Sequence, residues 1–207
     1  MSNRKTSICK SCLIKLGSHY HKFEFNKLRP YYMELDLKLT SKEINEIMWS
    51  CCKTLSTAES CTAGRISAAI TAVPGSSDYF KGGLICYSDE LKQNFLNVEA
   101  EIIESQTAVS EEVVKQMVYG ANELFGTDIA LAISGFAGPG GPDGGRSGVL
   151  VGTIWIAVGN KEKIVTRIIE EDNGRDKNLS SATSIAIHML LDYLKETCPK
   201  EDKIEEL

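Results

Sequence analysis

Short apolar segments alternate with amphipathic segments between residues 40 and 197, and this alternation restricts the fold more than any other feature of the chain. The predicted strands cover residues 54–58, 84–87, 129–134, 149–158 and 163–170. A first predicted helix is capped by Thr40 or Ser41 and carries an apolar stripe of Ile44, Ile47 and Met48. Further predicted helices cover residues 63–72, 89–96, 111–125 and 176–197. A sheet whose strands alternate with helices has helices on both of its faces. We therefore predict an α/β fold, a three-layer α/β/α sandwich with a mixed, mostly parallel sheet.

The N-terminal segment differs from the rest of the chain in charge and in patterning. Residues 1–40 contain 8 of the 23 basic residues but only 3 of the 28 acidic ones, and the whole chain has a net charge of −5. Neither helical nor strand periodicity is sustained there. We expect residues 1–36 to be a basic extension outside the core and residues 37–207 to form one domain. An alternative is that translation begins later, for example at Met33.

Four side chains of the extension are of the types that bind zinc: Cys9, Cys12, His19 and His21. Structural zinc sites usually separate their two ligand pairs by a longer loop and space the two histidines more widely. We therefore prefer a plain tail to a metal site, and we predict no metal.

The seven cysteines are odd in number and scattered, which favours free thiols in a reducing compartment. The chain has no signal-peptide apolar region and no apolar run long enough to cross a bilayer. Its net negative charge gives no field that attracts nucleic acid. We expect a cytoplasmic protein that binds neither nucleic acid nor membrane.

The first candidate site is the segment 58–64, a predicted strand-to-helix turn that contains Ser60. Free backbone N–H groups at a helix N-terminus can hold a phosphate or stabilise the oxyanion of an acyl-transfer intermediate. The alternative is that Ser60 or Thr62 only caps the helix.

The second candidate site is the segment 134–145, which has 6 glycines and follows a predicted buried strand. Glycine lets the backbone approach a ligand closely. The segment matches neither a Walker A loop nor a dinucleotide-binding fingerprint. It forms either part of a pocket at the end of the sheet or a flexible hairpin loop.

A serine nucleophile needs a base, and the chain has only three histidines. Two lie in the N-terminal extension, and His188 lies in an apolar helical run, where a packed or capping histidine is expected. A lysine can take the proton if its environment makes it neutral. Lys92, which follows Tyr87, is the candidate, although an exposed lysine is the ordinary alternative.

These motifs together resemble the CinA C-terminal domain family, whose active members are nicotinamide-nucleotide amidases. The resemblance extends from about residue 40 to about residue 193. The motifs that carry it are residues 58–64, Tyr87 with Lys92, residues 108–110, residues 135–141 and Gly174-Arg175.

The resemblance implies an amidohydrolase of pyridine nucleotide salvage that deamidates nicotinamide mononucleotide to nicotinate mononucleotide and ammonia. It implies Ser60 as the nucleophile, Lys92 as the base and Tyr87 as an assisting hydroxyl, with no metal or cofactor. It also implies a homo-oligomer whose partner is the small nucleotide substrate. Residues 37–207 are then a stand-alone CinA C-terminal-like amidohydrolase domain. The residues expected at the substrate are Cys61, Thr62, Gly135, Gly138, Pro139, Gly140, Gly141, Arg146 and Arg175.

Two positions depart from the family pattern. Ala63 replaces the usual glycine, which is tolerated if φ is negative there. Asp89 replaces the usual asparagine and, if close, would hold Lys92 protonated. This second departure leaves open a non-catalytic nucleotide-binding or competence/damage-associated regulatory module.

Two further alternatives concern single residues. A thiol at a helix N-terminus has a lowered pKa, so Cys61 is a rival nucleophile. Arg175 is a candidate phosphate ligand. The alternative is that it caps a helix or pairs with Asp172 or Glu171.

Overall fold

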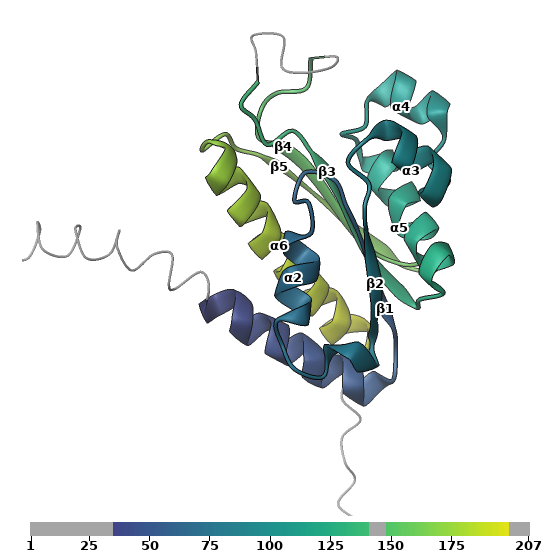
Figure 1. Ribbon diagram of the computed structural model, residues 1–207, viewed down its shortest axis with the longest axis vertical. Coiled ribbons are helices and arrows are strands. Elements are labelled where there is room, and N and C mark those ends of the chain that lie inside the picture. Colours follow the sequence, from purple (N-terminus) through teal and green to yellow (C-terminus); the bar gives the residue numbers. More distant parts are fainter. Residues whose placement is uncertain (1–34, 141–147, 199–207) are drawn as a thin grey trace, which may run out of the picture. The chain divides into compact units, whose positions relative to one another are not determined.

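The computed structural model describes residues 35–140 and 148–198. The chain divides into two compact units, residues 1–36 and residues 37–207. The second unit contains the sheet and the helices that cover it (Figure 1).

A five-stranded mixed sheet forms the centre of this unit, with strand order β2-β1-β3-β4-β5. The strands are β1 (Leu55–Glu59), β2 (Phe80–Ile85), β3 (Ile129–Gly135), β4 (Thr153–Gly159) and β5 (Ile164–Glu170). In the described residues β1 pairs in parallel with β2 and β3, whereas β4 is antiparallel to β3 and β5. The predicted mixed sheet is confirmed, but it is not mostly parallel, because the described strands form two parallel and two antiparallel pairs.

Helices cover both faces of the sheet (Figure 1). One face packs against a helix over residues 37–51, α2 (Arg65–Thr71) and α6 (Arg175–Thr197). The other face packs against α3 (Asp89–Leu96), α4 (Ala100–Gln106) and α5 (Glu111–Phe125). The short 3₁₀ helix η1 (Ser76–Asp78) leads into β2. The predicted three-layer α/β/α sandwich is confirmed.

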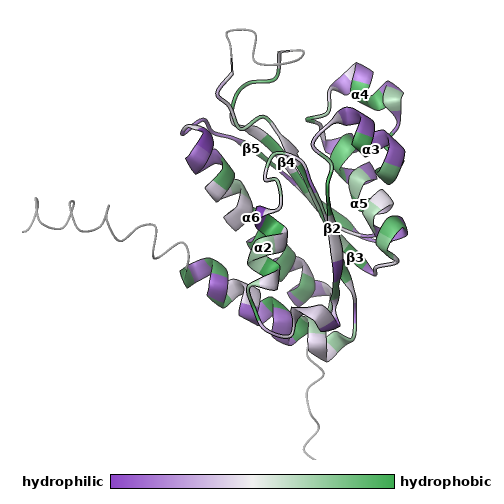
Figure 2. Cartoon of the chain, in the orientation of Figure 1, coloured by the Kyte–Doolittle hydropathy of each residue, from purple (hydrophilic) through white to green (hydrophobic). Residues whose placement is uncertain are grey.

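Local sequence explains where several elements begin and end. Ser88 and Ser110 cap α3 and α5 by accepting backbone N–H bonds from Leu91 and Val113. Gly126 ends α5 in the left-handed conformation that favours glycine. Figure 2 shows the central strands and α2 as mostly hydrophobic and the first turn of α6 as hydrophilic, in agreement with their burial and exposure.

Several boundaries differ from the predicted ones, and β4 begins at Thr153 rather than at residue 149. The first helix begins before residue 40, so Thr40 and Ser41 lie inside it rather than capping it. β2 begins at Phe80 because Gly82 and Gly83 continue the strand despite their low strand propensity. A Cβ on Gly83 would lie 2.2 Å from the Thr57 hydroxyl, so close packing against β1 requires glycine there. The seven-residue α4 was not predicted.

None of the helices in the described residues combines the length and the apolar character that crossing a bilayer requires.

Candidate functional site

Ser60 directly follows β1 and is nearly buried, with 7% of its surface exposed. Its backbone N–H donates to the carbonyl of Ile133 in β3 at 3.0 Å. Among the described residues, no hydrogen bond involves Ser60 Oγ. The N-cap of α2 is Gly64 and no N-cap side chain bonds to the helix, so the interpretation of Ser60 or Thr62 as an ordinary cap is wrong.

The carboxylate of Glu59, the last residue of β1, takes the place of such a cap. Glu59 is 1% exposed and accepts hydrogen bonds from the N–H groups of Gly64, Ile66 and Ser67 at 3.0, 3.1 and 2.8 Å. These donors are therefore unavailable to a substrate anion, which corrects the expectation that the N-terminus of this helix is open. The backbone N–H groups of Cys61 and Thr62 donate to no backbone carbonyl in the described part of the chain and lie near the Cys61 sulfur, so they are the remaining donors beside Ser60.

Ala63 lies in the same turn and has a φ of 50°. This is the left-handed region, which costs an L-residue about 1–2 kcal/mol and favours glycine. The condition under which alanine would replace glycine without strain is therefore not met.

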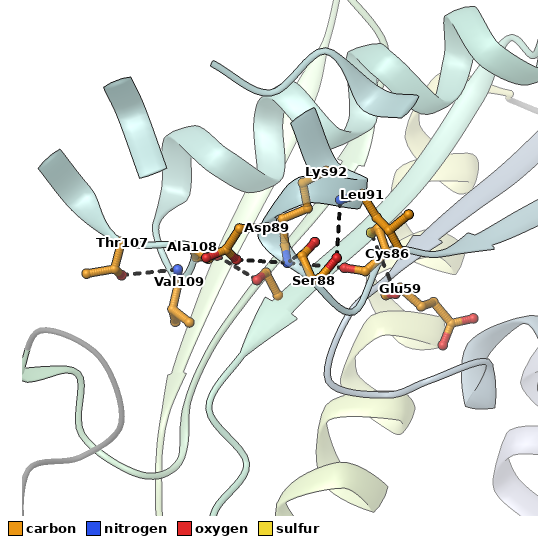
Figure 3. Close-up of polar contacts among 10 residues, drawn as sticks. Glu59, Cys86, Ser88, Asp89, Leu91, Lys92, Thr107, Ala108 and Val109 are labelled. Carbon is orange, nitrogen blue, oxygen red and sulfur yellow. Dashed lines mark hydrogen bonds and ion pairs between the residues drawn. The ribbon is translucent and has the colours of Figure 1, made fainter. Parts of the chain in front are cut away.

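Lys92 is buried in α3, with 1% of its surface exposed. Its Nζ donates to the carbonyl oxygens of Cys86 at 3.1 Å and Ser88 at 3.5 Å, and lies 3.6 Å from Oδ1 of Asp89. Figure 3 shows the amine directed toward the loop after β2. The interpretation of Lys92 as an exposed lysine is wrong, and Asp89 meets the condition of lying close to it.

The turn after β1 and the loop after β2 bring Ser60 and Lys92 to the same edge of the sheet. Cys86 connects them: its N–H donates to the carbonyl of Glu59 at 2.9 Å, and its own carbonyl accepts from Lys92 (Figure 3). Within the described residues, the side chains of Ser60 and Lys92 are not directly hydrogen-bonded to each other. Their contact through Tyr87 or a water stays a prediction.

An open pocket of about 600 Å³ lies beside this edge. Tyr87, whose side chain is 58% exposed, and Phe136 contribute its aromatic lining, and Asp89 and Glu104 contribute its charged lining. The remaining lining residues are Ser88, Gln93, Ile103, Thr107, Ala108, Val109 and Val149. Ser60 and Lys92 do not line this pocket.

The segment Thr107–Val109 forms one wall of the pocket. Ser134, at the end of β3, donates its hydroxyl to the carbonyl of Ala108 at 2.6 Å, and the Thr107 hydroxyl accepts from the N–H of Val109 at 3.1 Å. Thr107 has a φ of 69° and a ψ of 165°, a backbone region otherwise almost restricted to glycine. The hydrogen bond from Ser134 of β3 therefore holds the strained segment Thr107–Val109 in place.

The start of the glycine-rich loop is tied to α6. The Arg175 guanidinium donates to the carbonyl of Gly138, and the buried Asn178 side chain donates to that of Ala137 at 3.1 Å. Gly138 has a φ of 80° and precedes a cis bond to Pro139. Gly135 ends β3, whereas Pro139 and Gly140 are exposed. Gly141 and Arg146 lie outside the described residues.

Arg175 is exposed and makes no ion pair with Asp172 or Glu171 within the described residues. Its guanidinium is near enough to the Cys61 thiol to act on it electrostatically. This places its charge beside the Ser60 turn.

The thiols at the site are buried and unreactive. Burial raises the pKa of Cys61 to about 12 and that of Cys86 to about 11. The Glu59 carboxylate adds to both increases. The lowered pKa expected for a thiol at a helix N-terminus is therefore not found for Cys61, and burial disfavours the thiolate that a nucleophilic role requires.

His188 lies away from Ser60. Its Nδ1 is 2.8 Å from the carbonyl of Ser184 and its Nε2 is 3.4 Å from the Thr40 hydroxyl, so it packs α6 against the first helix. The predicted packing role is confirmed.

No group of three metal-binding side chains occurs in the described residues, and the candidate zinc ligands of the extension lie outside them.

Sequence reasoning missed the contributions of Glu59, Ser134 and Asn178. One signal was available for Glu59, because a carboxylate directly before a helix N-terminus favours the exposed N–H groups there. The bonds of Ser134 and Asn178 join residues 26 and 41 positions apart, and no local pattern marks them.

The fold and the site define an α/β domain with a buried serine directly after β1 and a buried lysine in α3, the helix that follows the adjacent parallel strand β2. The sequence profile of the CinA C-terminal domain matches residues 38–194. The chain therefore belongs to the CinA C-terminal domain family.

Known relatives agree with this assignment. A CinA-like protein of Cytophaga hutchinsonii is 35% identical over 169 residues, which are 82% of this chain and 40% of that protein. The chain thus spans less than half the length of this relative.

Two solved structures have a similar fold. A CinA superfamily protein from Klebsiella pneumoniae 700603 superimposes with a TM-score of 0.72 and 33% identity, covering 77% of this chain and 98% of that one. The competence/damage inducible protein CihA from Agrobacterium tumefaciens gives a TM-score of 0.71 and 30% identity, covering 76% and 94%.

Proposed function

We propose that the domain is an amidohydrolase that converts nicotinamide mononucleotide to nicotinate mononucleotide and ammonia. The observation that supports this most strongly is the placement of Ser60 directly after β1 and of Lys92 in α3, the helix that follows β2. Ser60 Oγ makes no hydrogen bond within the described residues, and two available N–H groups follow it. A hydroxyl beside such donors has the elements of acyl-transfer chemistry.

In the proposed reaction Ser60 Oγ bonds to the carboxamide carbon and its proton passes to neutral Lys92, directly or through the Tyr87 hydroxyl. The N–H groups of Cys61 and Thr62 stabilise the oxyanion. The C–N bond breaks, the leaving nitrogen takes the proton from Lys92, and ammonia departs. Water then hydrolyses the acyl-serine ester, which releases the carboxylate product and restores Ser60.

The pocket beside Tyr87 has the properties required for the ring of such a substrate. Two aromatic side chains, Tyr87 and Phe136, and four aliphatic ones line it, and its volume of about 600 Å³ is within the range of small-molecule sites. The phosphate would lie on the side of Arg175, with Arg146 as a second candidate. We also propose a cytoplasmic location and a homo-oligomer, as the resemblance implies.

Ammonia release from nicotinamide mononucleotide tests the proposal. We expect activity in the wild type and about a 1,000-fold loss in Ser60→Ala and in Lys92→Met. Lys115→Met, at a half-exposed lysine of α5, is the matched control and should retain activity. Cys61→Ala should also retain activity. Full activity of Ser60→Ala would refute the proposed nucleophile.

A non-catalytic nucleotide-binding module is the second candidate. Three acceptors, two carbonyls and the Asp89 carboxylate, face Lys92 Nζ, which matches the three hydrogens of an ammonium group rather than a base. Calorimetric binding of nicotinamide mononucleotide without any ammonia release by the wild type would favour this candidate.

A further inference from the structure

Glu59 is a buried carboxylate next to Ser60, and the proposed chemistry does not use it. Its two oxygens accept five hydrogen bonds, all from the turn after β1 and the start of α2. Oε2 accepts from Thr62 Oγ1 at 2.7 Å, Gly64 N at 3.0 Å and Ile66 N at 3.1 Å, and Oε1 accepts from Ser67 N at 2.8 Å and Ser67 Oγ at 2.6 Å. Hydrogen bonds to a charged acceptor are about twice as strong as neutral ones.

These bonds determine the shape of the Ser60 turn. The Thr62 hydroxyl ties the middle of the turn back to Glu59, while the N–H of Ala63 donates to the carbonyl of Ser60 at 3.2 Å. Ala63 is thereby kept at a strained positive φ. With the helix N–H groups occupied by Glu59, the N–H groups of Cys61 and Thr62 remain for the substrate.

The main chain of Glu59 also connects this turn to Lys92. Its carbonyl accepts from Cys86 N at 2.9 Å, and the carbonyl of Cys86 accepts from Lys92 Nζ at 3.1 Å. Figure 3 shows Glu59 and Lys92 on either side of Cys86. One residue therefore links both halves of the site.

We propose that Glu59 is a positioning residue that presets Ser60 and the N–H groups of Cys61 and Thr62 for attack and oxyanion stabilisation, chiefly through the Thr62 hydroxyl. The proposal rests on Ser60 being the nucleophile. Donors that are fixed before the reaction act on the transition state more than on the ground state, so their loss reduces kcat with little change in KM.

Two variants at the partners of Glu59 separate positioning from stability. Glu59→Gln removes a buried acceptor and can unfold the chain. Thr62→Val and Ser67→Ala each remove one hydroxyl bond to the same carboxylate, of 2.7 and 2.6 Å. Ser67→Ala also removes a 2.8 Å hydroxyl contact with Thr57, so it should lose at least as much stability as Thr62→Val. Thr62→Ser keeps the hydroxyl and serves as the rescue variant.

The measurements are kcat, KM and melting temperature with nicotinamide mononucleotide as substrate. We expect Thr62→Val to lose at least 10-fold in kcat with KM within twofold of the wild type, and Thr62→Ser to recover most of the loss. Ser67→Ala should stay within twofold in kcat while its melting temperature falls. Equal losses of kcat in Thr62→Val and Ser67→Ala, or losses that follow melting temperature, would overturn the proposal.

A fluorophosphonate probe makes the result independent of the amide substrate. Ser60 Oγ bonds to phosphorus, the P–F bond breaks, fluoride leaves, and the hydroxyl proton passes to the base or to water. If the wild type releases no ammonia but its Ser60 is labelled, the proposed substrate fails, and slower labelling in Thr62→Val than in Ser67→Ala still supports the positioning role. Equal labelling rates, or no labelling of Ser60, would overturn it.

Discussion

At the scale of single residues, the environment of Lys92 decides how the site can work. Its amine is buried and faces two carbonyls and the carboxylate of Asp89. A nearby carboxylate favours the charged form of lysine, and a base must be neutral when it accepts the proton. Asp89 therefore opposes the role proposed for Lys92.

Removing this charge should increase activity. We expect Asp89→Asn to raise kcat/KM for ammonia release several-fold near neutral pH, because the variant removes a negative charge 3.6 Å from the Lys92 amine. Glu90→Gln is the matched control, since it removes a charge from the same turn of α3 at an exposed residue. An unchanged or lower rate in Asp89→Asn would mean that the carboxylate helps to hold the amine in place.

The strain at Ala63 gives a second prediction at this scale. Because its φ is 50°, Ala63→Gly should raise the free energy of unfolding by about 1 kcal/mol. Ala68→Gly, at an exposed position inside α2, should lower it by about 1 kcal/mol. Urea unfolding of the two variants measures both values, and changes of the same sign would contradict this reading of the turn.

At the scale of elements, the site depends on the pairing of β1 with β3, and Asp128 fixes the start of this pair. Oδ2 of Asp128 accepts from the Thr54 hydroxyl at 2.7 Å and from the Thr54 N–H at 2.8 Å. The Thr54 N–H and O–H groups hold the pKa of Asp128 below its ordinary 3.8. A carboxylate with a lowered pKa stabilises the fold above its unfolded pKa and loses this effect as the pH falls through its folded pKa.

The stability of Asp128→Asn should accordingly depend on pH. At pH 7 we expect its free energy of unfolding to be about 1 kcal/mol below that of the wild type, since Asp128 is partly solvated. The difference should shrink as the pH falls below 3.8. Urea unfolding of the variant and the wild type at pH 7 and at a pH below 3.8 tests this. The control is Asp192→Asn, at an exposed position of α6. A constant difference would exclude the carboxylate charge as its cause.

At the scale of the whole molecule, the hydrophobic core lies within residues 37–198. Ile44, Ile47 and Met48 of the first helix pack with α2 and α6 in one cluster, and the family profile begins at residue 38. We expect a chain of residues 37–207 to fold alone and to melt within a few degrees of the full chain. Scanning calorimetry of both chains measures this. A much lower melting temperature would mean that residues 1–36 belong to the folded core.

The sequence by itself determined the order of the elements, the three layers and the positions of both candidate motifs. Helical and strand periodicity, caps such as Ser88 and stops such as Gly126 are local signals, so they can be read without the fold. Burial of Ile44, Ile47 and Met48 followed from their spacing in the same way.

The tertiary structure decided how the motifs work together. It placed Glu59 over the start of α2, forced Ala63 to a positive φ, put Asp89 beside Lys92 and tied Ala137 and Gly138 to α6. The bonds of β3 and α6 join residues far apart in the chain, and the strength of hydrogen bonds such as those of Glu59 changes when donor–acceptor distances shift by a few tenths of an ångström. Such distances are set by packing of the whole sheet, because side chains in a close-packed interior leave little room for adjustment.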